Sequence, residues 1–229
     1  AEGAKAGQAE RERKEQASGR RVGGGQFKVP DPEQAQPAPK AQRNFTDPES
    51  RIQKTADGFI QGYTAVLAVD ETAQVIVAQH VTPSAPEVRE LIPAVEAIER
   101  VLGQPPGQVV ADAGYWSEDN VERLEAKGID LYLARGRMKH GEEAPPPPRG
   151  RIPAKLNVAE RMQRKLRTKA GRAVYARRKA IVEPVNGQIK HARGFRQFLR
   201  RGVERVGQEW SLVCTAHNLL KLRAAWAPA

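Results

Sequence analysis

The order of apolar segments between residues 62 and 134 limits the possible folds of this chain more than any other feature. Two segments rich in β-branched residues, "GYTAVLAVD" (62–70) and "QVIVAQHV" (74–81), flank the short link "ETA", which predicts a β-hairpin. Four more segments follow, in the order helix, strand, helix, strand: 86–103, 108–115, 117–128 and 129–134. Strands that alternate with helices are typical of a sheet covered by helices, so the sequence predicts an α/β fold.

Local signals set the ends of the predicted helices. Pro93 lies inside the pattern at 86–103, so this helix is expected to start late or to kink, and Gly103 is suited to end it. Ser117 is a suitable N-cap for the next helix.

The last third of the chain is predicted to be helical and basic. It follows a polar loop at 135–153 that contains the stiff run "PPPP". Proline is tolerated in the first turn of a helix, so a helix is expected to start or bend at Pro184. The predicted segments are a long basic helix, a second helical piece and a last helix, at 157–182, 183–193 and 203–226.

Residues 1–44 show no apolar periodicity. Their mixture of charge, Gly, Pro and Gln cannot bury enough apolar surface to offset the entropy of ordering, so we expect a disordered arm. Order should begin near Phe45, which gives one folded domain over 45–226.

The net charge of +11 is concentrated in one part of the chain. Residues 149–205 carry 18 Lys and Arg against 3 Asp and Glu, a net of +15, whereas residues 46–148 carry 9 against 17, a net of −8. This asymmetry indicates an anionic partner, nucleic acid before a membrane surface. No apolar run reaches the roughly 18 residues of a bilayer span. The lone Cys214 excludes an intramolecular disulfide, which fits a reducing cytoplasm.

Asp112 is the first candidate site residue. It ends the apolar run "VVA" and precedes "AGY", so its carboxylate should lie at the carboxyl edge of a strand, where open α/β sheets build their sites. The alternative is an Asp that caps the following turn.

Glu183 is the second candidate, because it is a lone acid in the most basic part of the chain. On a helix, Glu183, Gly187 and Lys190 would share one face, and Gly187 would leave room beside the acid. Such a carboxylate could hold a metal ion against a polyanion. The alternative is an ordinary solvated face of charged residues.

Three longer stretches resemble a known family. They are "RNFTDPESRIQKTADGFIQGYTAVLAVD" (43–70), "VVADAGYWSEDN" (109–120) and "YARRKAIVEPVNGQIKHARGFRQFLRRG" (175–202). In this order and spacing they resemble the DDE transposases of bacterial insertion sequences. The resemblance implies a ribonuclease H-like mixed sheet flanked by helices. It also implies DNA cleavage and strand transfer in DNA transposition, in the cytoplasm of a bacterium and associated with the nucleoid.

The resemblance also implies roles for individual residues. In that family two Asp and one Glu hold two divalent metal ions, Mg²⁺ or Mn²⁺, and the second Asp and the Glu fall on Asp112 and Glu183. Two such ions activate the attacking oxygen of a phosphodiester reaction and stabilise the leaving one. A related signature places Tyr and Arg before that Glu and Lys after it, and this stretch has all three. The expected DNA-binding residues are Tyr175, Arg178, Lys190 and Arg193.

The family's first catalytic Asp lies on the first strand of the sheet, in a segment similar to "DGTK", which this sequence lacks. Residues 1–44 resemble the variable insertion that follows that strand. Asp47, Asp57 and Asp70 remain as candidates, although Asp70 falls at the hairpin turn, where Asp is favoured for turn geometry. We therefore expect a C-terminal fragment without the first strand, the first acid and the N-terminal DNA-binding part, and inactive alone.

Two other functions stay open on the sequence alone. One is a non-enzymatic DNA-binding remnant that holds phosphates through residues 149–205, and the other is a metal-independent basic RNA-binding protein. Self-association is left open, and no membrane partner is expected.

Overall fold

A computed structural model describes Arg13, Gln16, 42–55, 58–136, 146–150, Pro153 and 155–226. The chain divides into two compact units, Ala1–Arg43 and Asn44–Ala229. The disordered arm expected over residues 1–44 lies almost wholly outside the described residues, and so do Asp57 and most of the polar loop. The fold described below is that of the second unit.

The described strands form three two-stranded sheets. β1 (Arg51–Thr55) and β2 (Gly58–Gly62) pair antiparallel, as do β3 (Thr64–Val69) and β4 (Ile76–Thr82). β5 (Gln108–Ala111) and β6 (Asp130–Leu133) pair in parallel. The α/β class and the β3–β4 hairpin are therefore confirmed. The single mixed sheet of a ribonuclease H-like fold is not seen, because β3 and β5 each pair with one neighbour only among the described residues.

The parallel pair is joined by a helical crossover, as parallel strands require. After β5 come a short 3₁₀ helix, η2 (Ala113–Tyr115), and α3 (Glu118–Ala126). Ser117 caps α3 by accepting a hydrogen bond from the Asn120 amide at 3.0 Å, which confirms the predicted N-cap. The first turn of α3 is acidic, which complements the positive end of the helix dipole.

The helix expected over 86–103 starts late, as its proline indicated. A 3₁₀ turn, η1 (Glu87–Arg89), leads into α2 (Leu91–Leu102), so Pro93 lies in the first turn, where its missing N–H costs nothing. Gly103 ends α2 with a φ of 72°, a left-handed conformation that favours glycine.

The prediction of one long helix over 157–182 is wrong. The chain forms α4 (Val158–Arg167) and α5 (Lys169–Gly187), separated at Thr168, whose backbone is extended. Thr168 Oγ1 accepts a hydrogen bond from the Gly171 amide at 2.9 Å and so starts a new helix. A Cβ on Gly171 would collide with the carbonyl of Lys165, so the tight link between α4 and α5 depends on this glycine.

Pro184 lies inside α5 and does not start a helix, which corrects the boundary predicted at 183. A proline has no N–H to donate to the carbonyl four residues earlier, that of Ala180. Gln74 Nε2, at the turn of the β3–β4 hairpin, donates to this carbonyl at 3.0 Å. The helix therefore continues across the proline and ends in a π-helical turn, η3 (Gln188–Ala192).

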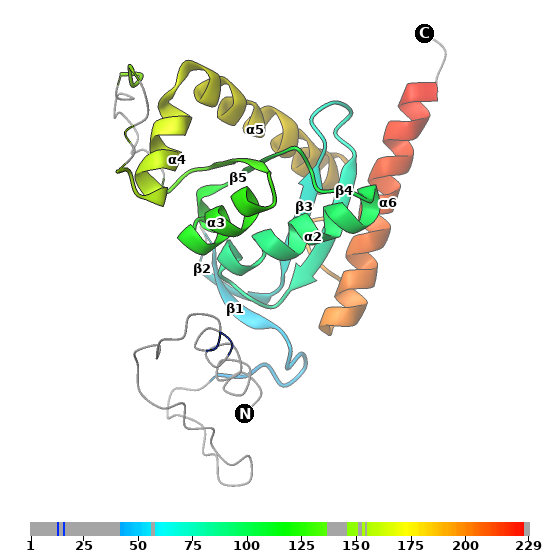
Figure 1. The fold of residues 1–229 in the computed structure, drawn as a ribbon. Helices are drawn as coiled ribbons and strands as arrows, with labels where there is room; N and C mark the ends of the chain where they lie inside the picture. Colours follow the sequence, from blue (N-terminus) through cyan, green and yellow to red (C-terminus); the bar gives the residue numbers. More distant parts are fainter. Residues whose placement is uncertain are drawn as a thin grey trace. The chain divides into compact units, whose positions relative to one another are not determined.

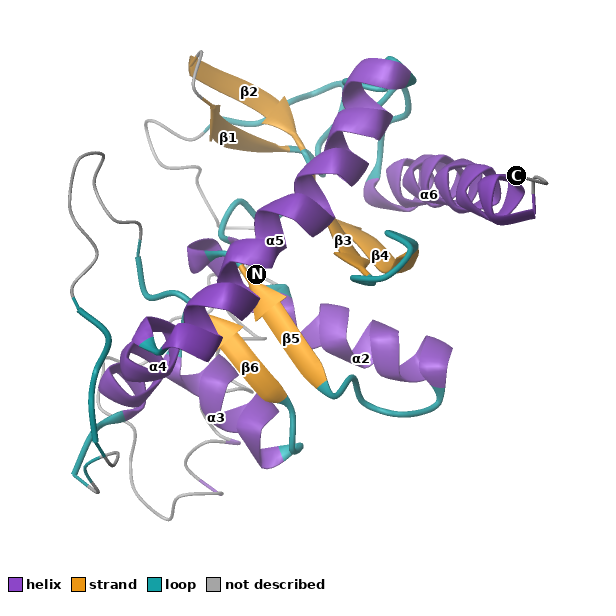
Figure 2. Cartoon of the chain, turned by 90° about the horizontal axis from the view of Figure 1, so that it is seen from above, coloured by secondary structure: helices purple, strands orange, loops and turns teal. Residues whose placement is uncertain are grey.

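Two apolar clusters stabilise the unit. In Figure 1, α5 lies above β5, and α2 and α3 lie below it; Figure 2 shows the same arrangement from above. The first cluster joins α2, α3, β6 and α4 through Leu91, Ile92, Val95, Val121, Leu124, Ile129, Leu131, Leu133 and Met162. The second joins β4, α5, η3 and the last helix through Ile76, Val185, Ile189, Trp210 and Cys214. Parallel strands covered by helices on two sides are typical of α/β domains.

The last helix, α6 (Val203–Trp226), has the predicted bounds and packs against β4. Asn218 makes two hydrogen bonds of 2.8 Å, to the amide and the carbonyl of Ile76, and so satisfies backbone groups of β4 that have no strand partner. Trp210 Nε1 donates to the Val66 carbonyl of β3 at 3.3 Å. In the described part of the chain, no helix combines the length and apolarity needed to cross a bilayer.

Candidate functional site

Asp112 follows β5 directly, which confirms its predicted place at the carboxyl end of a strand. Its Oδ1 accepts a hydrogen bond from the Ala113 amide at 2.7 Å and so caps η2. The two interpretations of Asp112 are therefore not exclusive. One carboxylate oxygen has the capping role, and the other remains for a further partner.

The turn that carries Asp112 is held firmly in place. Asn120 is buried and donates through Nδ2 to two carbonyls, those of Val88 at 2.7 Å and Tyr115 at 2.8 Å, which ties η1 to η2. A Cβ on Gly114 would collide with the tip of the Glu87 side chain, so the Glu87 carboxylate lies directly against the glycine of "DAGY". The roles of Asn120 and Glu87 could not be predicted from the sequence, because no local signal pairs residues as far apart as Val88 and Asn120, 32 positions.

Arg178 of α5 lies against Asp112. Its Nη1 is 3.3 Å from Asp112 Oδ2, and the two side chains are 19% and 35% exposed. The guanidinium carbon lies 5.5 Å from the centre of the Tyr175 ring, a cation–π arrangement one helical turn away. The structure thus brings together three of the predicted site residues.

The Arg178 guanidinium keeps unused donor capacity. Its Nε is buried and has no hydrogen-bond partner within the described residues. Guanidinium groups bind phosphate through two parallel N–H donors, and Nε is one of the atoms that can serve. A phosphate oxygen could therefore bind here if Arg178 turned from Asp112.

Three carboxylates act on Tyr115, the last residue of η2. Burial, together with the charges of Glu87, Glu90 and Asp112, raises the pKa of Tyr115 to about 12. His80 Nε2 lies 2.8 Å from Glu90 Oε2, so one of these acids has an imidazole partner. Arg178 and His80 are therefore the described basic partners of two of these carboxylates, at Asp112 and at Glu90.

The side chains of Glu183 and Lys190 are exposed, and neither side chain forms a hydrogen bond or ion pair with another described residue. Glu183 follows Arg178 by five positions, which turns its side chain about 140° away around the helix axis, as 3.6 residues per turn require. The π-helical turn after Gly187 also shifts Lys190 from the α-helical phase on which the shared face was predicted. The role of Glu183 as a ligand stays a prediction.

Arg193 lies beside a buried histidine. His217 is fully buried, and its Nε2 donates to the carbonyl of Gln74 at 2.9 Å, because a carbonyl can only accept. Its Nδ1 is therefore the acceptor for Arg193 Nη1 at 3.1 Å. This contact gives Arg193 a structural role beside the predicted DNA-binding one, which no contact in the structure tests.

The candidates for the first acid have structural roles where they are described. Asp70 accepts hydrogen bonds from the amides of Thr72, Ala73 and Val75 at 2.6–2.9 Å, which confirms its role at the hairpin turn. Burial opposes its charge, but these amides outweigh burial and lower the pKa of Asp70. Asp47 is buried and accepts from the Tyr63 hydroxyl at 2.6 Å.

The described residues do not complete a two-metal site. Asp112 and Glu183 offer the oxygen ligands that Mg²⁺ prefers. Over residues 42–55, 58–136, 146–150, 153 and 155–226, however, no three acidic, histidine or cysteine side chains gather as a metal site needs. No step through a metal can be derived from these side chains alone.

A comparison with protein families matches residues 27–219 to the model described as "Transposase DDE domain". Neither the curated proteins nor the solved structures contain a significant match.

Proposed function

The chain belongs to the transposase DDE domain family, and on that premise we propose that it contributes part of the active site for DNA cleavage and strand transfer in the transposition of a bacterial insertion sequence. The observation that supports this most directly is the contact between Arg178 and Asp112. It joins the strand-end acid to the basic helix that the family resemblance paired with it.

We assign Asp112 and Glu183 to the carboxylate set that holds divalent metal, Mg²⁺ or Mn²⁺, in this family. A metal ion held by such carboxylates would activate the attacking oxygen of a phosphodiester reaction. Tyr175 and Arg178 are assigned to binding the phosphate, with Tyr175 fixing the plane of the guanidinium. Lys190 and Arg193 are assigned to the flanking phosphates.

We also propose that the described residues need one more strand and one more acid. Among the described strands, β3 and β5 each have a single partner, so each leaves an edge that a further strand could pair with. A strand between them would complete a mixed sheet of ribonuclease H type and could bring the first Asp beside Asp112. On this proposal the catalytic domain extends over 45–226 and is inactive without that strand.

A DNA-binding role without cleavage is the second candidate. It is favoured by one observation, that Arg178 already occupies the free oxygen of Asp112. The net charge of +15 over residues 149–205 serves DNA binding in both cases.

A plasmid assay tests the DNA binding that both functions share and the need for a further acid. The purified chain is mixed with supercoiled plasmid and Mg²⁺ or Mn²⁺, and binding is measured in parallel by mobility shift. We expect salt-dependent binding with no nicking or joining. Nicking that disappears in both Asp112→Asn and Glu183→Gln, but persists in Arg177→Gln, would show a complete site and overturn the need for a further acid. Absence of DNA binding at low salt would overturn both functions.

A further inference from the structure

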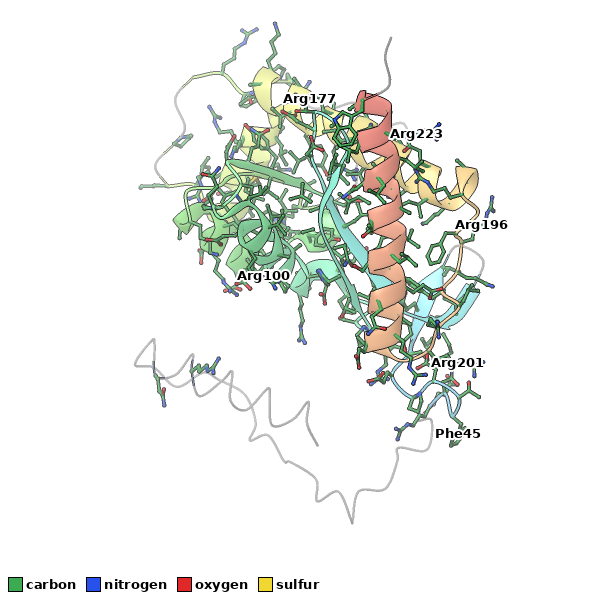
Figure 3. The ribbon with its side chains drawn as sticks, turned by 90° about the vertical axis from the view of Figure 1, so that its right-hand side faces the viewer. Phe45, Arg100, Arg177, Arg196, Arg201 and Arg223 are labelled. Carbon is green, nitrogen blue, oxygen red and sulfur yellow. The ribbon has the colours of Figure 1, made fainter. Side chains whose placement is uncertain are left out.

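Residues at the N-terminal end of α6 form an exposed surface that combines an aromatic ring with cations. Phe45 is 93% exposed and Leu199 is 75% exposed, the highest values among the exposed large apolar side chains apart from Trp226 at the end of α6. Arg200 and Arg201 are exposed as well. Figure 3 shows Phe45 and Arg201 at the same end of the unit, away from Arg177. We call these four residues the Phe45 surface.

The turn that carries Phe45 is rigid, although its ring has almost no contact with protein. Asn44 Oδ1 accepts hydrogen bonds from the amides of Thr46 at 3.0 Å and Asp47 at 3.2 Å, which fixes the backbone on both sides of Phe45. The Ser50 amide donates to the Asp47 carbonyl at 3.1 Å and closes the next turn. A rigid turn that projects an apolar ring into water gains no stability from that ring.

The turn is fastened to the start of α6. Asp47 Oδ1 accepts from the Gly202 amide at 3.3 Å, and Glu49 Oε2 accepts from the Val203 amide at 2.8 Å. Two carboxylates thereby satisfy free amides at the helix N-terminus. They also hold the turn that carries Phe45 at the end of the unit where Arg201, the residue before Gly202, lies.

Hydrogen bonds to α6 also hold the segment that carries the two arginines. The Glu209 carboxylate accepts from the amides of Leu199 and Arg200 at 3.0–3.1 Å. Phe198 packs into the core against Trp210, with ring centres 6.1 Å apart. With Phe198 directed inward, Leu199 and the two arginines that follow it are exposed.

The carboxylates of this region already have hydrogen-bond partners. Asp47, Glu49 and Glu209 all accept hydrogen bonds from backbone amides, whereas no ion pair within the described residues engages Arg200 or Arg201. The guanidinium groups of Arg200 and Arg201 therefore have no carboxylate partner in the described part of the chain and stay available to phosphates.

From these contacts we infer that the Phe45 surface binds a single-stranded segment of DNA, with one base stacked on Phe45 and phosphates held by Arg200 and Arg201. This rests on the proposed role of the chain in DNA transposition. An exposed aromatic ring beside cations is the combination by which proteins bind single strands. A duplex offers the ring no free base face unless a base step is first unstacked, which opposes binding.

Fluorescence anisotropy with a labelled oligo-dT strand, and with a duplex of equal length, tests the inference in EDTA. Leaving out divalent metal separates this test from cleavage at Asp112 and Glu183. Phe45→Ala should weaken single-strand binding about 5- to 100-fold, the usual range for one stacked base, without changing the salt dependence. Phe45→Trp should restore binding. Arg200→Ala with Arg201→Ala should instead lower the slope of log K against log salt by about 1.4, two phosphates at about 0.7 each.

Two variants at other exposed positions of α6 serve as controls. Leu212→Ala removes a similar apolar side chain, and Arg223→Ala removes a cation near the far end of α6, where Figure 3 shows it. Both should bind the strand as the unchanged chain does. Circular dichroism checks that each variant is folded.

Three results would overturn the inference. The first is equal single-strand affinity of Phe45→Ala and the unchanged chain, which would leave Phe45 for a protein contact. The second is an equal loss on strand and duplex, which would make the surface a duplex contact. The third is binding of the duplex with no binding of the strand, which would sink this surface while leaving the proposed function intact.

Discussion

Arg178 Nη1 lies 3.3 Å from Asp112 Oδ2, and this contact joins α5 to the end of β5. The other oxygen of Asp112 already caps η2 through the Ala113 amide. The single carboxylate of Asp112 therefore lies at the end of β5, caps η2 and contacts α5. The acid that the family resemblance marks as a metal ligand is also a structural residue.

The first prediction concerns this ion pair. Arg178→Gln should lower the free energy of unfolding by about 1–2 kcal/mol, because it removes a half-buried ion pair and the cation–π contact with Tyr175. Arg177→Gln is the matched control, since the exposed pair of Arg177 with Glu71, at 2.9 Å, should contribute less than about 0.5 kcal/mol. Urea denaturation measures both. Equal losses in the two variants would show that the Arg178–Asp112 contact adds nothing.

The second prediction concerns the link between α4 and α5. Gly171→Ala should destabilise the unit by about 1–3 kcal/mol, because its Cβ would collide with the Lys165 carbonyl and come within 3.0 Å of Thr168 Oγ1. Gly187→Ala is the control, because its φ of −61° is helical and no atom lies within 4 Å of its Cβ. It should stabilise by about 0.5–1 kcal/mol. Thermal melts compare the two, and a neutral Gly171→Ala would disprove the tight link.

The third prediction concerns Gln74, the one non-glycine residue with positive φ (57°) among the described residues. Its side chain donates to the Ala180 carbonyl, and its Oε1 accepts from Lys221 Nζ at 2.9 Å. Gln74→Gly removes both contacts but relieves the backbone, whereas Gln74→Ala removes them and keeps the strain. Gln74→Ala should therefore cost about 1 kcal/mol more than Gln74→Gly in chemical denaturation. The reverse order would show that the turn is not strained.

The fourth prediction concerns pH. Burial first, and then the charges of Arg193 and Lys221, lower the pKa of His217 below its ordinary 6.5, although the hydrogen bond to Gln74 opposes this. Between the lowered pKa and 6.5 the unfolded chain binds a proton that the folded chain does not. The contribution of the neutral His217 side chain to the free energy of unfolding is therefore complete above pH 6.5. It is lost as the pH falls through the lowered pKa of His217. His217→Gln should flatten this part of a stability–pH curve, and an unchanged slope would contradict the assignment.

The fifth prediction concerns Cys214. The side chain is buried in the second apolar cluster, and burial raises the pKa of its thiol to about 12. Because the thiolate is the reactive form, the folded chain should react with a disulfide reagent at pH 8 far more slowly than the unfolded chain. Absorbance during labelling, with and without denaturant, measures the two rates. Equal rates would place Cys214 at an exposed position.

Local signals in the sequence predicted most of the elements. The β3–β4 hairpin, the late start of α2 at Pro93, the Ser117 cap and the bounds of α6 each follow from neighbouring residues. The break at Thr168 was missed, because a threonine within a basic helical pattern shows its capping role only when the chain turns there. The helix boundary predicted at Pro184 was wrong, because the group that satisfies the Ala180 carbonyl comes from Gln74, 106 residues earlier.

In the candidate site, too, features that depend on neighbouring residues were predictable, and features that depend on packing were not. The place of Asp112 after its strand was predictable, because strand and turn adjoin in the sequence. Its contact with Arg178 depends on how α5 packs across β5, and the support from Asn120 depends on how η1 meets η2. Neither leaves a local pattern. The assignments of Glu183 and Lys190 rest on family resemblance, and the structure leaves both side chains in solvent.

The Gln74 turn has a mechanical consequence. Its backbone carbonyl is held by His217 of α6 and its side-chain amide by Ala180 of α5, so neither helix can slide past the other without breaking a contact at this one residue. Glu183 lies within one turn of the contact on α5, and the Phe45 surface lies at the start of α6. The turn therefore fixes the distance along the protein between Glu183 on α5 and the Phe45 surface at the start of α6.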